Sequence, residues 1–171
     1  TSRADYYCYV GRLSEEKGVR SLLEAASKVK HELRIAGGGP LTDELKAKYA
    51  HCPNIKFLGH LDAHGVASLL SQAKCSVMPS VCYENNPLGV IESLCAGTPV
   101  VGANIGGIPE LISADTGIIF ESGNAEVLAT GIDMAMSRTW HHPEIKTESI
   151  NRFSPESHLK ILANIYSNTK D

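Results

Sequence analysis

The chain has 171 residues, of which 43% are hydrophobic and 20% are charged, and its formal net charge is −3. These values are typical of one globular domain with its own core, and they exclude a strongly basic surface for nucleic acid. A phosphate site would therefore have to be built locally, from a few cationic side chains and helix ends. No apolar run approaches the roughly 18 residues needed to span a membrane, and no signal peptide is evident.

Strand-like apolar runs alternate with helical patterns along the whole chain. Strands are predicted over 6–10, 32–36, 55–58, 75–79, 99–102 and 117–120; helices are predicted over 17–29, 41–50, 63–73, 87–96, 124–136 and 155–166, with a short helical turn over 108–112. Asp62 is expected to cap the helix over 63–73. Only the segment 138–149 gives no clear pattern. This alternation predicts a Rossmann-like α/β/α fold with three layers and a mostly parallel sheet.

Loops with chemically suggestive residues follow successive predicted strands. They cover 11–12, 37–39, 59–60, 80–86 and 103–107. Because the carboxyl ends of parallel strands meet at one edge of a sheet, and ligands bind outside that edge, we expect these loops to form a single site.

The first of these loops carries two cations, Arg12 and Lys17, within Gly-Arg-Leu-Ser-Glu-Glu-Lys-Gly. Arg12 offers a planar fork of donors and Lys17 a point charge, and this pair suits two neighbouring phosphates. We expect Lys17 to lie at a helix start, where the helix dipole adds positive potential. The alternative is a surface ion pair between Arg12 and Glu15 or Glu16.

The stretch 84–101 combines two carboxylates with a helix start and stop. Asn85 and Asn86 are candidate caps, and Pro87 is expected as the first helical residue. The free amides of Leu88 and Gly89 would then favour an anionic or oxygen-rich ligand.

Glu84 precedes this helix and Glu92 lies inside it. Carboxylates accept hydrogen bonds only, which suits the vicinal hydroxyls of a ribose or a hexose. The alternative is that Glu84 is an ordinary loop acid and Glu92 an ordinary solvated helix acid.

The glycines 37–39 form neither a Walker loop nor a Gly-x-Gly-x-x-Gly turn after the first strand, so an ordinary dinucleotide dehydrogenase is disfavoured. They let the backbone approach a bulky ligand, or they simply make a tight strand-to-helix turn. His60 can stack on a base or hydrogen-bond to it, and a partly exposed loop histidine is an equal alternative.

The five cysteines are odd in number and have no Cys-x-x-Cys spacing, which argues against a disulfide framework and a zinc site. Cys8, Cys75 and Cys95 lie in apolar runs and are expected to be buried. A reducing cytoplasmic setting fits this pattern best. No Asp-x-Asp motif is present to hold a metal on a diphosphate.

Two glutamates eight positions apart, then Cys-Ala-Gly-Thr-Pro-Val-Val and Gly-Gly-Ile-Pro-Glu, together resemble the donor-binding signature of the retaining glycosyltransferases of family four, glycosyl transferases group 1. Gly-Arg-Leu-x-x-x-Lys-Gly extends the resemblance. The family has the GT-B fold. The resemblance implies that residues 1–171 form its C-terminal, nucleotide-sugar-binding domain, that 153–171 are the closing helix, and that the N-terminal acceptor domain is absent.

The resemblance also implies a role for each candidate residue. Arg12, Lys17 and Glu84 would serve catalysis. Arg12 and Lys17 would hold the diphosphate, Gly38 would lie near the nucleoside, His60 and Leu61 would receive the base, Glu92 would hold the ribose, and Glu84, Asn85, Asn86, Leu88 and Gly89 would surround the hexose. No cofactor or metal is expected. One departure is Asn86-Pro87, where many members have an aromatic residue and a glycine; because Pro87 has no N–H, one amide contact is lost.

The activity implied is transfer of a hexosyl group, with retention, from a UDP-, GDP- or ADP-linked sugar to a glycan, lipid or small molecule. In the enzymes resembled, the acceptor attacks beside the departing phosphate. The expected partners are the nucleotide sugar and the chain's own N-terminal domain, with no nucleic acid. A cytoplasmic location is expected, compatible with peripheral membrane contact through the missing domain. This piece alone is expected to transfer nothing. The alternatives are a non-catalytic nucleotide-sugar-binding module and a GT-B epimerase acting on a UDP-sugar.

Overall fold

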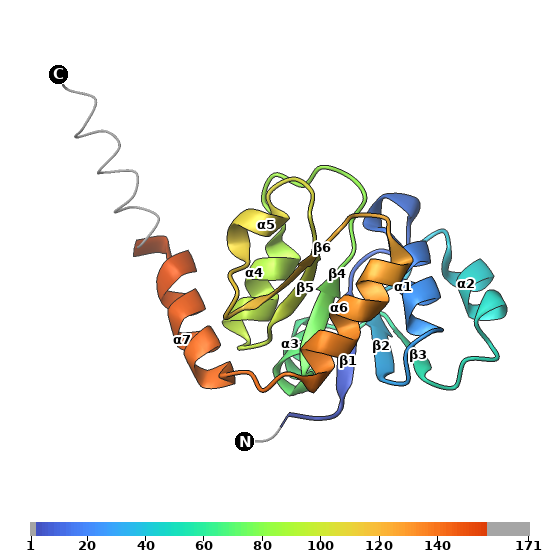
Figure 1. Cartoon of the computed structure of the whole chain (residues 1–171), viewed down its shortest axis with the longest axis horizontal. Coiled ribbons are helices and arrows are strands. Elements are labelled where there is room, and N and C mark those ends of the chain that lie inside the picture. Colours follow the sequence, from blue (N-terminus) through green and yellow to red (C-terminus); the bar gives the residue numbers. More distant parts are fainter. Residues whose placement is uncertain (1–2, 157–171) are drawn as a thin grey trace.

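The structure is a computed structural model and describes residues 3–156 (Figure 1). Its strands are β1 (Tyr6–Val10), β2 (Glu32–Ala36), β3 (Ile55–Gly59), β4 (Cys75–Met78), β5 (Val100–Ala103) and β6 (Gly117–Phe120). Its helices are the short 3₁₀ helix η1 (Glu15–Lys17), α1 (Val19–Ala26), α2 (Thr42–Lys48), α3 (Ala63–Gln72), α4 (Leu88–Cys95), α5 (Ile108–Leu111), α6 (Ala125–Ser137) and α7 (His142–Phe153).

The six strands form one parallel sheet in the order β3-β2-β1-β4-β5-β6. The chain runs outward from β1 to β3, then crosses back and continues outward on the other side from β4 to β6. The order therefore reverses between β1 and β4, and in such sheets this is where ligands bind. The prediction of a Rossmann-like α/β/α fold is confirmed.

Helices cover both faces of the sheet because side chains alternate along the central strand. On β1, Tyr7 and Tyr9 belong to the large core cluster with α1 and α6, which lie against each other (Figure 1). Tyr6 and Cys8 face the opposite way and pack with Leu69 and other residues of α3. The apolar positions of α1 recur at helical spacing and are fully buried, and each such leucine contributes about 2 kcal/mol.

The helix predicted over 17–29 is wrong at its start. Lys17 ends η1, Gly18 is left-handed with φ 67°, and α1 begins at Val19. A Cβ at Gly18 would lie 1.8 Å from the carbonyl oxygen of Pro79, so only glycine fits there. Lys17 therefore ends η1 and directly precedes the N-cap of α1, whereas the prediction placed it within one continuous helix.

The start of the helix over 87–96 also differs from the prediction. Pro87 is extended, with ψ 92°, and is the N-cap, so Leu88 is the first residue of α4. Neither Asn85 nor Asn86 makes the expected capping hydrogen bond, and both side chains are exposed. Gly97, with φ 77°, follows the end of α4 as predicted.

The segment without a clear pattern forms most of α7, which packs against α4 through the buried Ile145 (Figure 1). The terminal helix predicted over 155–166 lies almost wholly outside the described residues. Within residues 3–156, no helix is both long and apolar enough to cross a bilayer.

Candidate functional site

The predicted loops gather at the carboxyl edge of the sheet, because all six strands are parallel. The β1 loop is held by main-chain bonds to the β2 loop, from the Gly11 amide to Ala36 O (3.0 Å) and from the Leu13 amide to Gly38 O (3.1 Å). The Tyr9 hydroxyl also donates to Arg12 O at 2.8 Å. The backbone that carries Arg12 is thus fixed before any ligand arrives.

Two adjoining hollows open at this edge. A smaller one, of about 330 Å³, is formed by the loops after β1, β2 and β3 and is lined by Arg12, Gly38, His60 and Leu61. A larger open one, of about 1000 Å³, lies between α3 and α4 and is lined by Glu92. The two hollows share four lining residues, namely Val10, His60, Leu61 and Val66.

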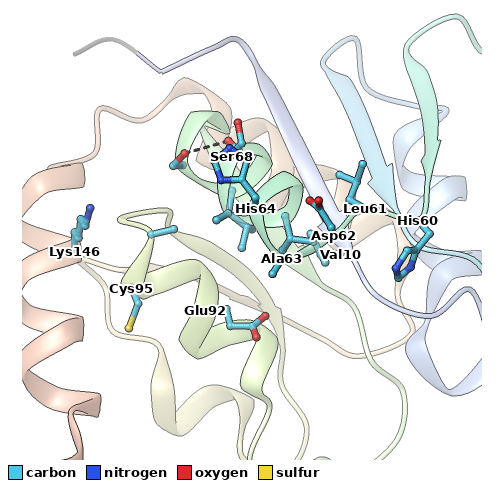
Figure 2. Close-up of a pocket in the computed structure, with 15 residues that line it drawn as sticks. Val10, His60, Leu61, Asp62, Ala63, His64, Ser68, Glu92, Cys95 and Lys146 are labelled. Carbon is cyan, nitrogen blue, oxygen red and sulfur yellow. Dashed lines mark hydrogen bonds between the residues drawn. The ribbon is translucent and has the colours of Figure 1, made fainter.

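Figure 2 shows how the larger hollow is built. Glu92 projects from α4 into the space facing α3, while His60 and Leu61 lie at the other side on the loop after β3. Arg12 and Glu92, 80 positions apart in the chain, therefore come to the same edge and to connected hollows. Glu92 is exposed, and its carboxylate makes no hydrogen bond or ion pair with the described residues.

The side chain of Arg12 likewise has no ion pair or hydrogen bond within residues 3–156. The alternative of a surface pair with Glu15 or Glu16 is not observed. Glu15 instead pairs with Arg20 at 2.8 Å, and Glu16 accepts a hydrogen bond from Ser14 at 2.6 Å. Arg12 lines the smaller hollow; its charge also acts on Glu16, whose pKa is lowered first by the hydrogen bond from Ser14 and to a smaller extent by Arg12.

Lys17 and Glu84 form an ion pair across the point where the strand order reverses. Lys17 Nζ lies 2.8 Å from Glu84 Oε1, and the Ser80 hydroxyl donates to the same oxygen. Burial is the largest single effect and raises the pKa of Glu84. The hydrogen bonds from Lys17 and Ser80 and the charge of Lys17 together lower it by more, so this pKa lies below its ordinary 4.5. Glu84 is a carboxylate at neutral pH.

The backbone at Glu84 is held by the loop after β5. The Gly107 amide donates to Glu84 O at 2.7 Å, and Gly106 has φ 58°. A Cβ at Gly106 would lie 2.7 Å from the backbone of Glu84, and a Cβ at Gly107 would lie 2.6 Å from the carbonyl oxygen of Asn85. The loops after β1, β4 and β5 therefore meet at Glu84.

The first turn of α4 presents two backbone donors. The amides of Leu88 and Gly89 have no acceptor within the described part of the chain, as is usual at a helix start. Together with Lys17 and Arg12 they give a set of donors suited to an anion or to hydroxyls.

Some predicted site residues stay apart from the hollows. Lys17, Glu84 and the two asparagines line neither hollow, and Asn85 and Asn86 have exposed side chains without recorded hydrogen bonds. Their roles stay predictions. Within residues 3–156, no three His, Cys, Asp or Glu side chains are grouped so as to hold a metal ion.

Other lining residues were not predicted. Val66 and Cys95 line the larger hollow, and Cys95 is partly exposed rather than buried as expected. Their spacing was the available signal: Val66 lies four positions after the N-cap Asp62, and Cys95 three after Glu92, so each shares a helix face with a residue near the site. Asp62 does cap α3, accepting from the Gly65 amide at 2.7 Å.

Residues 4–138 match the family model named Glycosyl transferases group 1. The chain belongs to this family. An uncharacterized glycosyltransferase of Methanocaldococcus jannaschii, MJ1607, is 31% identical over 170 residues, which is 92% of this chain and 43% of that protein. A glycogen synthase of Mycobacterium tuberculosis is 39% identical over 119 residues, covering 64% of this chain and 28% of the enzyme. The chain thus spans less than half the length of these relatives.

Solved structures support the same assignment of fold. The lipopolysaccharide outer core galactosyltransferase WaaB superposes with a TM-score of 0.84 at 20% identity, over 97% of this chain and 50% of that one. A glycosyltransferase from Rickettsia africae gives 0.81 at 25% identity, over 100% and 50%. This glycosyltransferase family chain has the Rossmann-like fold of one half of a GT-B enzyme.

Proposed function

We propose that this chain is the donor-binding half of a retaining glycosyltransferase that transfers a hexosyl group from a nucleotide-diphosphate sugar to an acceptor. The observation that carries the proposal is the connection between the hollow lined by Arg12 and the hollow lined by Glu92. A nucleoside diphosphate carries an anionic part and a hydroxyl-bearing part in one molecule, and Arg12 and Glu92 offer the matching chemistry in hollows that adjoin.

In this proposal the diphosphate lies against Arg12 and Lys17, with the nucleoside between Gly38 and the loop of His60 and Leu61. Each charge-assisted hydrogen bond to phosphate is worth about 1.5–3 kcal/mol, so several can stabilise the group without a metal ion. Glu92, which has no competing partner within the described residues, accepts from the ribose hydroxyls.

The hexose would lie beside Glu84 and the amides of Leu88 and Gly89, with Asn85 and Asn86 at its rim. During transfer the bond from the anomeric carbon to the phosphate oxygen breaks and a bond to the acceptor oxygen forms on the same face. The acceptor's proton leaves to the departing phosphate. Developing negative charge on that phosphate would be stabilised by Arg12, Lys17 and the helix start, which is the principal electrostatic contribution of this half.

Structural relatives lend support for a nucleotide sugar as ligand. Anabaena Alr3699/HepE, whose TM-scores here are 0.82 and 0.79 at 20% identity, was solved in complex with UDP and with UDP-glucose. The curated relatives also include a GDP-mannose-dependent mannosyltransferase of Mycobacterium tuberculosis, so we leave the base open among UDP, GDP and ADP.

Calorimetric titration of UDP, GDP and ADP, each with and without a linked sugar, tests the proposal. We expect one nucleotide to bind, and Arg12→Ala and Lys17→Ala each to weaken it about tenfold or more, because each removes a charge-assisted contact. The matched control is Arg138→Ala, an arginine beside Trp140 that lines neither hollow. Affinity that is unchanged in both site variants would refute the assignment.

An enzyme is separated from a non-catalytic binding module by Glu84→Ala in the full-length protein. We expect turnover to fall by about two orders of magnitude, because the variant loses a contact to the reacting sugar. A change confined to within a factor of two would instead favour the binding module.

A further inference from the structure

The carboxyl-terminal ends of α3 and α4 converge on one side chain, Arg3. The guanidinium is partly buried and donates to carbonyl groups of both helix ends and to a threonine hydroxyl. Its partners are Leu70 O (3.1 Å), Ser71 O, Thr98 Oγ1 (3.1 Å), Ala96 O (2.9 Å) and Gly97 O (3.1 Å).

On the α3 side, Arg3, Ala4 and the first residue of β1 cap the helix end. The last four carbonyl groups of a helix lack partners inside it, and here residues 3–6 donate to all four, in addition to the Ala73 amide that reaches Leu69 O and Leu70 O. The bonds run from the Tyr6 hydroxyl to Leu69 O (2.8 Å), from Arg3 Nη1 to Leu70 O (3.1 Å) and Ser71 O, and from the Ala4 amide to Gln72 O (2.9 Å).

On the α4 side, the absence of a side chain at Gly97 leaves room for the same guanidinium. Gly97 is left-handed, and a Cβ there would lie 3.0 Å from Arg3 Nη2 and 2.6 Å from His142 O. His142 Nδ1 donates to Gly97 O at 2.9 Å, and Thr98 Oγ1 donates to Leu70 O at 2.5 Å, which links the two helix ends a second time.

Electrostatics explains why a cation is needed there. The carboxyl end of each helix carries about half a negative charge, so two such ends brought together repel each other. A guanidinium between them replaces that repulsion with attraction, and its planar fork can reach both ends at once. A lysine would supply the charge but not the two-sided geometry.

The helices joined in this way are the two walls of the larger hollow. Leu70, Ser71 and Ala96, whose carbonyl groups accept from Arg3, line this hollow together with Leu61 and Glu92. The separation of α3 and α4 at Arg3 therefore governs where Glu92 lies relative to the loop of His60 and Leu61.

We propose that Arg3 is a positioning residue for nucleoside binding, because it fixes the distance between the two helices that carry the ribose and base contacts. This inference rests on the proposed function. Without Arg3 the walls would sample wider separations, only a fraction of molecules would be competent to bind, and the apparent dissociation constant would rise by the inverse of that fraction.

The test compares a nucleoside diphosphate with inorganic pyrophosphate in nuclear magnetic resonance titrations of the 171-residue chain. We expect Arg3→Ala to raise the dissociation constant of the nucleoside diphosphate about fivefold and that of pyrophosphate less than twofold, since only the former spans α3 and α4. Arg3→Lys, which keeps the charge and protects folding, should give a rise of about threefold for the nucleotide alone. Arg138→Ala should change neither.

A second readout needs no ligand, so that failure of the proposed function is distinguishable. Amide hydrogen exchange in the free protein should accelerate in both α3 and α4 of Arg3→Ala and Arg3→Lys, and remain unchanged in α1 and α6. Equal losses for nucleotide and pyrophosphate, no loss for either, or unaltered exchange in α4 would each overturn the role of Arg3. If the wild type binds no nucleotide, the proposed function fails and exchange alone decides whether Arg3 sets the helix positions.

Discussion

At the scale of single residues, Lys17 and Glu84 already satisfy each other before any ligand binds. Glu84 holds the cation that the diphosphate is proposed to use, at 2.8 Å. We predict that Glu84→Gln tightens binding of the free nucleoside diphosphate about threefold while turnover of the full-length enzyme falls, because Lys17 is released from a competing carboxylate. Calorimetry and a transfer assay on the same variant measure both effects. Weaker binding of the free diphosphate would contradict this competition.

The same pair predicts a pH dependence of stability. The pKa of Glu84 is lower in the folded chain than its ordinary 4.5, so the unfolded state binds more protons in this range. The stabilisation is fully present above that ordinary value and is lost as pH falls through the lower, folded value. In urea titrations, the free energy of unfolding of wild type minus that of Glu84→Gln should stay constant from about pH 8 to 6 and shrink below about pH 4. A difference that grows on acidification would show that the sign is wrong.

The types of the residues were enough to predict which side chains come to the site, but not which contacts they make. Arg12 and Glu92 were singled out by type and spacing, and the fold brings them to one edge. The capping role predicted for Asn85 and Asn86 failed: both residues lie in a bend next to the backbone on which Gly106 and Gly107 pack, and Pro87 takes the N-cap position instead. That contact comes from residues 22 positions later, which local capping rules do not consider.

At the scale of elements, Gly18 decides where η1 ends and α1 begins. It combines φ 67° with a Cβ position 1.8 Å from Pro79 O. We predict that Gly18→Ala lowers the free energy of unfolding by about 3 kcal/mol or more, since both strain and a backbone collision must be relieved. Urea denaturation measures this loss.

Gly123 is the matched control for that experiment. It has φ 79° but only Val81 Cγ1 within 4.0 Å of its Cβ position, so Gly123→Ala should cost about 1 kcal/mol from backbone strain alone. Equal costs at the two glycines would mean that the contact between the β1 and β4 loops does not constrain Gly18.

The break at Gly18 also explains one error of the sequence analysis. Apolar spacing predicted a helix from 17 to 29, and α1 does bury Val19, Leu22 and Leu23 as that spacing requires. A single glycine inside a helical pattern is compatible with either a continuous helix or a stop. Only the approach of Pro79, in the loop that follows β4, selects the stop.

At the scale of the whole molecule, alternation of strands and helices predicted a parallel sheet with one binding edge, and both are present. The hydrogen bonds from Arg3 to the ends of α3 and α4 could not be predicted, because nothing in the local sequence indicates what an arginine before the first strand will contact. The helix α7 and its position against α4 were missed for a different reason: its sequence is polar and buries few residues, so it shows no clear apolar spacing.

Ligand binding should stabilise the whole chain if the proposed function is correct. At a nucleotide concentration about 100 times the dissociation constant, the free energy of unfolding should rise by about 2.7 kcal/mol. Thermal denaturation with and without nucleotide measures the shift. The shift should vanish in the double variant Arg12→Ala/Glu92→Ala, whose unliganded midpoint should stay near that of the wild type, since both side chains lack partners in residues 3–156. A shift that persists in the double variant would place binding elsewhere.

The most direct test is a crystal structure of the chain with the nucleoside diphosphate that binds most tightly. We predict one molecule spanning both hollows, with its phosphates within hydrogen-bond distance of the Arg12 guanidinium and its ribose hydroxyls on the Glu92 carboxylate. A bound nucleotide that does not contact both Arg12 and Glu92 would contradict this prediction.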